Sequence, residues 1–214
     1  MAFVSWILHV IRNPDELIRL SGYPLLLLML IIFAETGALV FFLPGDSLLV
    51  TAGLYAARGS LDILQLNLLL IPMAILGDAL SYYIGKKTGP ALFSRPRSRF
   101  FNPQHLRDAH AFYEKHGGKT IIIARFMPIF RTFVPVVAGA AEMGYTRFAL
   151  YNVVGGASWV SSMTLTGYLL ANWAARHNFP IDKHIEKLII VVVFLSILPA
   201  LIAYARRRLS KTAG

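Results

Sequence analysis

Five ionisable side chains stand inside apolar tracts of this chain: Glu35, Asp46, Asp78, Arg125 and Arg131. On insertion scales, a charge at the centre of a membrane-spanning helix costs about 2.5–3.5 kcal/mol. Such side chains must face protein or water, and some should pair with an opposite charge. Because ionisable groups at membrane depth mark substrate or ion sites, these positions predict a site of that kind.

The arginines and the acids of this site suit two different chemical roles. Arginine stays charged in any environment, and its planar fork suits a phosphate. A carboxylate in a low-dielectric site can hold a proton at neutral pH. Arg125 and Arg131 are therefore predicted to bind phosphate, and Glu35 and Asp46 to couple protons, with Asp78 as a secondary candidate. Alternatively, the acids and arginines only pair to hold the structure together, although buried ion pairs are poor stabilisers compared with apolar packing.

Prolines and glycines interrupt the same tracts, and we interpret them as helix breaks. They are Pro44 and Gly45 beside Asp46, and Pro128, Pro135 and Gly139 around Arg131. A broken helix leaves backbone N–H groups free, and helix N-termini with such donors attract anions. Two internal prolines also argue against a simple lipid-facing helix in the second tract. Both tracts are predicted to form re-entrant hairpins.

Composition predicts an all-α polytopic membrane protein. Hydrophobic residues make up 56% of the chain and charged residues 15%, against about 25% charged in soluble proteins. Several apolar runs approach the ~20 residues that cross a bilayer. The absence of cysteine excludes disulfides and thiolate metal sites. We expect no metal site and no cofactor, and we expect Trp6, Trp159 and Trp173 to lie at membrane interfaces.

The net charge of +10 is concentrated in two regions. Residues 85–119 hold eight lysines and arginines against two acids, and the tail adds Arg206, Arg207, Arg208 and Lys211. The positive-inside rule places both regions in the cytoplasm, beside anionic lipid. This reading is favoured over nucleic-acid binding, and it makes the C-terminus cytoplasmic.

The chain is predicted to have three parts. Residues 1–20 form an interfacial segment, 21–205 a membrane domain and 206–214 a basic tail. As one helix, the apolar tract Tyr23–Ala57 would be about 52 Å long, too long for one span and too short for two. We therefore predict about four transmembrane helices and two hairpins, at 22–41 (span), 42–57 (hairpin), 64–84 (span), 85–119 (basic connection), 120–141 (hairpin), 147–171 (span) and 187–205 (span). The hairpins then enter from opposite faces, as in transporters built from inverted repeats.

Three stretches carry a resemblance to a known family: FAETGALVFFLPGDSLL (Phe33–Leu49), GDALSYYIGKKTG (Gly77–Gly89) and the stretch Phe112–Val160 around ARFMPIFRTFVPVVAGAA. They resemble the bacterial DedA family of inner-membrane proteins, which shares a domain with eukaryotic scramblases of the vacuole membrane protein type. The resemblance covers about residues 20–205. It implies two opposed re-entrant hairpins, with the family's essential acids and arginines at Glu35, Asp46, Arg125 and Arg131. Some members are implicated in returning undecaprenyl phosphate across the cytoplasmic membrane, and others in maintaining the proton motive force.

Together, the residues and the resemblance favour a proton-coupled flippase for a lipid phosphate, most simply undecaprenyl phosphate, in the bacterial cytoplasmic membrane. Its partners would be this polyprenyl phosphate, membrane lipids and protons, and a homo-oligomer is compatible with the sequence. Alternatives are a proton-coupled transporter or antiporter for small ions or drugs, a passive phospholipid scramblase, and a membrane scaffold. No pairing of a nucleophile with a base is visible, so an enzyme is not predicted.

Overall fold

The computed structural model describes residues 23–37, 45–93 and 118–177, and within these ranges it is all-helical. The helices are α3 (Pro24–Gly37), α4 (Gly45–Ala57), α5 (Ile63–Phe93), α7 (Lys119–Arg125), α8 (Pro128–Ala140) and α9 (Tyr145–Arg176). The predictions for the interfacial segment 1–20, Pro44, the span 187–205 and the tail 206–214 fall outside the described residues.

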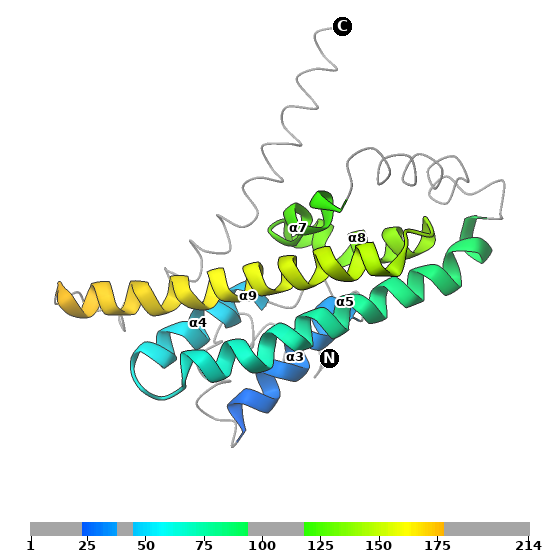
Figure 1. Cartoon of the computed structure of the whole chain (residues 1–214). Coiled ribbons are helices and arrows are strands. Elements are labelled where there is room, and N and C mark those ends of the chain that lie inside the picture. The colour runs from blue at the N-terminus through cyan, green and yellow to red at the C-terminus, as the bar shows by residue number, and fades with distance from the viewer. Residues whose placement is uncertain (1–22, 38–44, 94–117, 178–214) are drawn as a thin grey trace, which may run out of the picture.

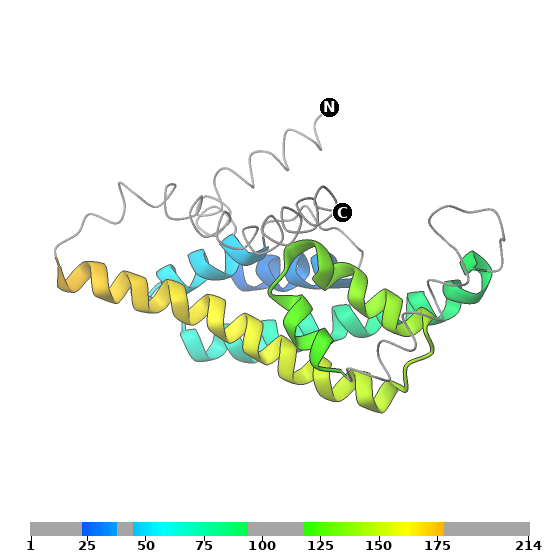
Figure 2. The same cartoon turned by 90° about the horizontal axis from the view of Figure 1, so that it is seen from above.

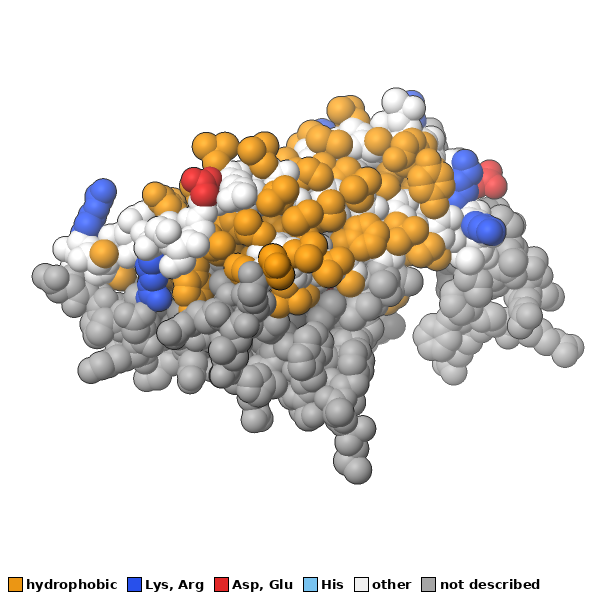
Figure 3. All heavy atoms as spheres, turned by 90° about the horizontal axis from the view of Figure 1, so that it is seen from below, with side chains coloured by type: hydrophobic (Ala, Val, Ile, Leu, Met, Phe, Trp, Pro, Cys, Tyr) orange, Lys and Arg blue, Asp and Glu red, His pale blue; other side chains and the backbone are white. Residues whose placement is uncertain are grey.

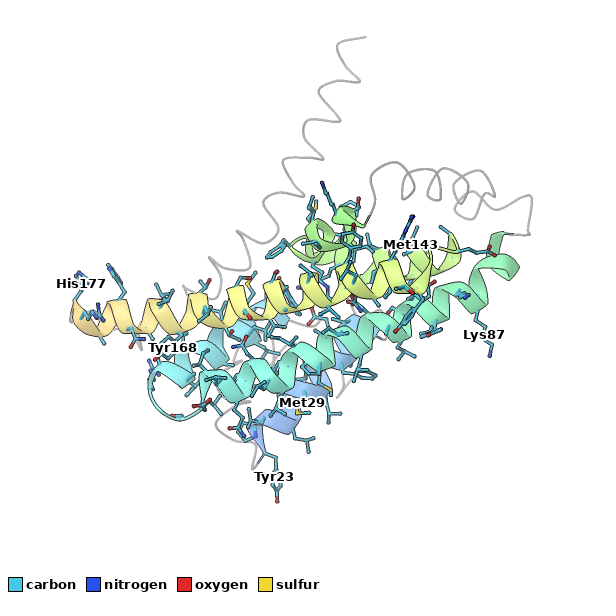
Figure 4. The ribbon with its side chains drawn as sticks, viewed as in Figure 1. Tyr23, Met29, Lys87, Met143, Tyr168 and His177 are labelled. Carbon is cyan, nitrogen blue, oxygen red and sulfur yellow. The ribbon has the colours of Figure 1, made fainter. Side chains whose placement is uncertain are left out.

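Two long helices, α5 and α9, lie side by side and run in opposite directions (Figures 1 and 2). Their 31 and 32 residues correspond to about 46 and 48 Å of helix. Among the described residues, one segment, Ile63–Gly89, is long and apolar enough to cross a membrane. Figure 4 places Lys87 and Met143 towards one end of the pair and His177 at the other.

The prediction that the span ends at residue 84 and a connection follows is wrong in part, because α5 continues to Phe93. Glycines at 85 and 89 weaken a helix in isolation. Here both pack tightly on α8, where a Cβ on Gly85 would overlap the carbonyl oxygen of Val136. Tertiary packing therefore carries the helix past the point where propensity predicts its end. The predicted span 147–171 is likewise extended, to Tyr145–Arg176.

Helices α3 and α4 form an antiparallel pair instead of a complete span followed by a half-membrane hairpin. Glu35 of α3 lies against Gly45 of α4, while Leu25 and Ala56 line one cavity at the opposite end of the pair. Helix α3 has 14 residues, or about 21 Å, which is shorter than the ~30 Å hydrocarbon core.

The direction of α3 also differs from the predicted topology. With the C-terminus inside and the hairpin 42–57 entering from outside, that topology puts residue 22 on the inner side of the membrane and residue 64 on the outer side. Leu25 shares its cavity with Gln65 at the start of α5, and Gly37 packs on Gly77 further along. The two helices therefore run the same way. Ser81 Oγ approaches the carbonyl oxygens of Thr36 at 2.7 Å and Gly37 at 3.2 Å, which satisfies acceptors that a helix end leaves open.

The second pair, α7 and α8, turns at Phe126 and Met127. Pro128 begins α8, a position that suits proline because its missing N–H has no intrahelical partner there. The prediction of a break at Pro135 and Gly139 is wrong, because α8 continues through both residues to Ala140. Gly139 instead allows a close approach, since a Cβ there would overlap the carbonyl oxygen of Tyr82.

The two short pairs extend from opposite ends of the α5–α9 pair towards its middle, where Glu35 and Asp46 of the first pair meet Arg131 of the second. Each is fixed by one close crossing, in which glycines of both helices face backbone carbonyls. A Cβ on any of these glycines would overlap the facing oxygen. The four contacts are Gly53 on Thr164, Gly167 on Val50, Gly139 on Tyr82 and Gly85 on Val136. On each of the four helices, the glycine and the residue whose carbonyl faces the other glycine are three positions apart. The crossing of α4 with α9 therefore has the same spacing as the crossing of α8 with α5.

Hydrophobic side chains cover the middle of the face in Figure 3, and charged side chains lie towards its two ends. On α5, the exposed apolar residues include Leu64, Leu68, Leu76 and Leu80. An exposed apolar band between polar ends is the surface that a bilayer requires.

We predict that Gly139→Ala and Gly53→Ala each destabilise the protein, because the added methyl must push two backbones apart. Overpacking of this kind costs about 1–3 kcal/mol. Thermal unfolding of the detergent-solubilised chain measures the loss. Gly144→Ala is the control, because a Cβ there meets nothing within 4 Å. Equal stability of all three variants would contradict the close crossings.

Candidate functional site

Arg131 joins the two acids of the first apolar tract. Its Nη2 pairs with Glu35 Oε1, and its Nη1 lies 2.5 Å from Asp46 Oδ1. Glu35 is 0% exposed, Asp46 8% and Arg131 6%. The guanidinium of α8 therefore holds the facing ends of α3 and α4 in a space from which water is largely excluded.

Trp159 of α9 completes this first cluster. Its indole Nε1 donates a hydrogen bond of 2.8 Å to Asp46 Oδ1, and the Arg131 guanidinium carbon lies 4.8 Å from the centre of its ring. The residue is 1% exposed, so its predicted place at a membrane interface is wrong. One side chain thus orients the acid through a hydrogen bond and the arginine through a cation–π contact.

The first cluster has one acid more than it has arginines. Arg131 bonds only Oε1 of Glu35, and Oε2 lies against Gly45, where a Cβ would overlap it. No side chain among the described residues donates to Oε2. With every group ionised, Glu35, Asp46 and Arg131 carry one negative charge in excess. Gly45 is thus required for the approach of a carboxylate as well as for the start of α4.

Arg125 forms a second cluster with Asp78, the secondary candidate. Its Nη2 pairs with Asp78 Oδ2 and donates to Asn152 Oδ1. Asn152 Nδ2 in turn donates to the carbonyl of Ile75 at 3.0 Å. Asp78 and Arg125 are each 2% exposed. This second cluster balances one acid with one arginine.

Two adjacent glycines on α9 make room for the Arg125 side chain. A Cβ on Gly155 would lie 3.0 Å from its Cδ, and one on Gly156 would lie 3.2 Å from its Nη1. Contacts this short force the neighbour to shift. The glycine pair in the sequence therefore marks where an arginine passes α9, a signal that reading along one segment does not reveal.

The second cluster lies near the middle of Ile63–Gly89, the described segment that is long and apolar enough to cross a membrane. Eleven residues separate Ile63 from Ala74, whose carbonyl lies 3.4 Å from Arg125 Nη2, and eleven separate Asp78 from Gly89. This gives about 16 Å of helix on either side. Arg125 is the last residue of α7 and Arg131 lies in the first turn of α8, so the two arginines flank the turn at Phe126 and Met127.

The structure brings together all five predicted ionisable residues, in two groups that the sequence did not assign. It places Gly45 and Pro128 at the first positions of α4 and α8, beside the clusters. Sequence analysis missed Asn152 and Trp159, and it gave Asp78 only a secondary place. Among the described residues, no group of acids and histidines is placed to hold a metal ion.

The described residues form an all-helical fold with buried ion pairs, in which one helix is long and apolar enough to cross a membrane. A family model of the VTT domain matches residues 43–169. The chain belongs to the DedA family of VTT-domain proteins.

Named relatives agree with this assignment. Protein DedA of Escherichia coli K12 is 42% identical over 209 residues, which are 96% of this chain and 93% of that protein. The uncharacterized membrane protein ML0287 of Mycobacterium leprae is 45% identical over 86% of this chain and 82% of its own length. The inner membrane protein YqjA of E. coli K12 is 35% identical over 76% and 72%. No solved structure matches the chain.

We predict that Trp159→Phe destabilises the protein by about 1–3 kcal/mol, because it keeps a ring beside Arg131 but removes the buried indole N–H that donates to Asp46 Oδ1. Trp173→Phe is the matched control, since Trp173 is 52% exposed on the same helix. The midpoints of thermal unfolding compare the variants. If Trp159→Phe unfolds together with the control, the hydrogen bond to Asp46 has no energetic role.

Proposed function

We propose that this protein is a proton-coupled transporter that moves a lipid phosphate, undecaprenyl phosphate, across the bacterial cytoplasmic membrane. The observation that carries the proposal is the pair of buried arginines among apolar helices, Arg125 held by Asp78 and Arg131 held by Glu35 and Asp46. A fold that needed only stability would use apolar packing there. A transporter needs groups that can exchange partners.

Carboxylate and phosphate are exchangeable partners for arginine, since both present oxygens to the same planar fork. In the structure, Asp78 forms an ion pair with Arg125, and Glu35 and Asp46 form ion pairs with Arg131. A phosphate that enters must displace some of these contacts. The carboxylates then stand where the substrate's oxygens would bind, and they keep both arginines paired when no substrate is present.

Protons provide the coupling. The excess negative charge of the first cluster can be neutralised by one proton, and Oε2 of Glu35 has no side-chain partner that would compete with it. Protonation of Glu35 weakens its bond to Arg131 and frees that arginine for phosphate. Proton uptake and anion binding therefore favour each other, which is the condition for coupled transport.

The membrane geometry is part of the proposal. Helices α3 and α4 form one re-entrant hairpin, α7 and α8 the other, and the units α3–α5 and α7–α9 form an inverted repeat. The equal spacing of the two glycine crossings supports this pairing. The end that carries Lys86, Lys87 and Arg147 faces the cytoplasm under the positive-inside rule. The same rule places the basic C-terminal tail inside.

We predict that Asp78→Asn destabilises the protein by about 3–5 kcal/mol, because it leaves Arg125 buried without a counter-charge. The double variant Asp78→Asn with Arg125→Gln has no charge left in this cluster, so most of the loss is recovered. Thermal unfolding measures both. Movement of labelled undecaprenyl phosphate in liposomes stays abolished in the double variant, because the phosphate has lost its arginine. A double variant that transports normally gives Arg125 a purely structural role.

We also predict that Glu35→Gln uncouples transport from protons. Glutamine has nearly the same shape but carries no titratable proton, so a pH gradient no longer drives lipid phosphate movement in liposomes. Glu142→Gln, an exposed acid after α8, is the control and retains the response. If the wild type moves lipid equally with and without the gradient, it is a passive scramblase. Proton-dependent ion or drug export without lipid movement identifies an antiporter.

A further inference from the structure

A groove of about 410 Å³ lies between α5 and α9, in the half of the molecule that contains the turn from α4 to α5. Apolar side chains from both helices line it, among them Leu64, Leu68, Ile71 and Leu165. Its volume falls within the ~300–1,000 Å³ of ligand pockets. The groove is separate from the two charged clusters, whose acids and arginines do not line it.

The polar groups in the groove are satisfied by the protein. Asn67 Nδ2 lies 2.9 Å from the carbonyl oxygen of Ile63 and 3.2 Å from Thr164 Oγ1. Ser161 Oγ donates to Asn67 Oδ1 at 2.8 Å. Because these side chains form hydrogen bonds with one another and with the backbone, they do not need a hydrogen bond from a ligand. The chemistry therefore favours a hydrocarbon occupant over a headgroup.

The position of the groove connects it to the charged clusters. It follows α5 from Ile63 to Pro72, which is about 13 Å of helix and close to the depth of one leaflet. Pro72 stands two residues before Ala74, a contact of Arg125. On the facing helix, Ser161 stands two residues after Trp159 of the first cluster. Along the helix axes, the inner end of the groove therefore lies about 3 Å from the level of Ala74 and Trp159.

We propose that this groove holds the first isoprene units of the polyprenyl phosphate whose phosphate binds at Arg125 and Arg131. The inference rests on the proposed function. Burial alone does not favour this site, because lipid chains already surround the exposed apolar residues of α5. What distinguishes the groove is its shape, which brings more atoms into contact with a chain, and an inner end that lies at about the level of the charged clusters along α5 and α9.

The test uses the full chain in liposomes and a polyprenyl phosphate with a diazirine on its second isoprene unit. Illumination is expected to label residues 63–72 of α5 and 161–165 of α9, as mapped by mass spectrometry. Leu165→Trp fills the groove and is expected to remove most of this labelling. Leu169→Trp is the matched control, because Leu169 lies one turn further along α9, is 63% exposed and does not line the groove.

Competition identifies the occupant. Unlabelled polyprenyl phosphate is expected to suppress the labelling, and an equal excess of phosphatidylglycerol is not. Equal suppression by both lipids overturns the proposal in favour of bulk lipid. Labelling that Leu165→Trp does not reduce also overturns it, as does a crosslink in lipid-free detergent that shows the groove filled by residues 187–205 or by a second copy.

The experiments distinguish an incorrect assignment of the groove from an incorrect proposed function. If Arg131→Gln abolishes transport of the polyprenyl phosphate while Leu165→Trp leaves labelling intact, only the groove assignment is wrong. If the wild type neither transports the polyprenyl phosphate nor is labelled by it in competition with the unlabelled compound, both are wrong.

Discussion

Every buried charge among the described residues has an opposite charge in reach, and this requirement determines where the short helices lie. Arg131 is paired across 85 and 96 residues of sequence to Asp46 and Glu35. Removing one partner of a buried pair leaves an uncompensated charge, which costs about 3–5 kcal/mol. Helix α7, with 7 residues, and α3, with 14, are marginal as isolated helices. Their positions therefore depend on the side chains that they present to the clusters.

The glycine crossings impose the second constraint. In lipid, helices gain little from the hydrophobic effect and associate through close packing and polar contacts. Gly53 and Gly167 bring α4 against α9, while Gly85 and Gly139 bring α5 against α8. Each short pair is thus anchored to a long helix from the other part of the chain. Neither α3–α5 nor α7–α9 forms a separate body, so displacement of one hairpin has to strain a crossing or an ion pair of the other unit.

The residues of the site could largely be predicted from their types, because charged side chains within apolar tracts must face protein or water. Which acid pairs with which arginine could not be predicted from the sequence. Asp46 and Asp78 are equally plausible partners for either arginine until α5, α8 and α9 are placed in space. Trp159 was misassigned for a related reason. Tryptophan is common at membrane interfaces, and nothing in its local sequence shows that its indole N–H reaches an acid 113 residues away.

The fold was harder to predict than the site, because hydropathy carries no direction. The tract Tyr23–Ala57 has the length of one span and a short hairpin, but it also has the length of two arms that turn at its centre. The structure shows two arms, since Glu35 meets Gly45 and Leu25 meets Ala56 around one cavity. At Pro135, a break was predicted where the helix continues. A proline in a helix that is packed against a neighbour need not interrupt that helix. Position relative to other helices decided both cases.

The two clusters differ in charge balance, and this difference gives them separate roles in the proposed transport cycle. Asp78 and Arg125 neutralise each other, so an anion that displaces Asp78 leaves a carboxylate unpaired at half depth. The first cluster already has one acid in excess, and a second negative charge nearby makes that excess more costly. A proton on Glu35 or Asp46 removes that excess. In the proposed cycle, anion entry at Arg125 therefore favours proton uptake in the first cluster, and the difference in charge balance couples the two events.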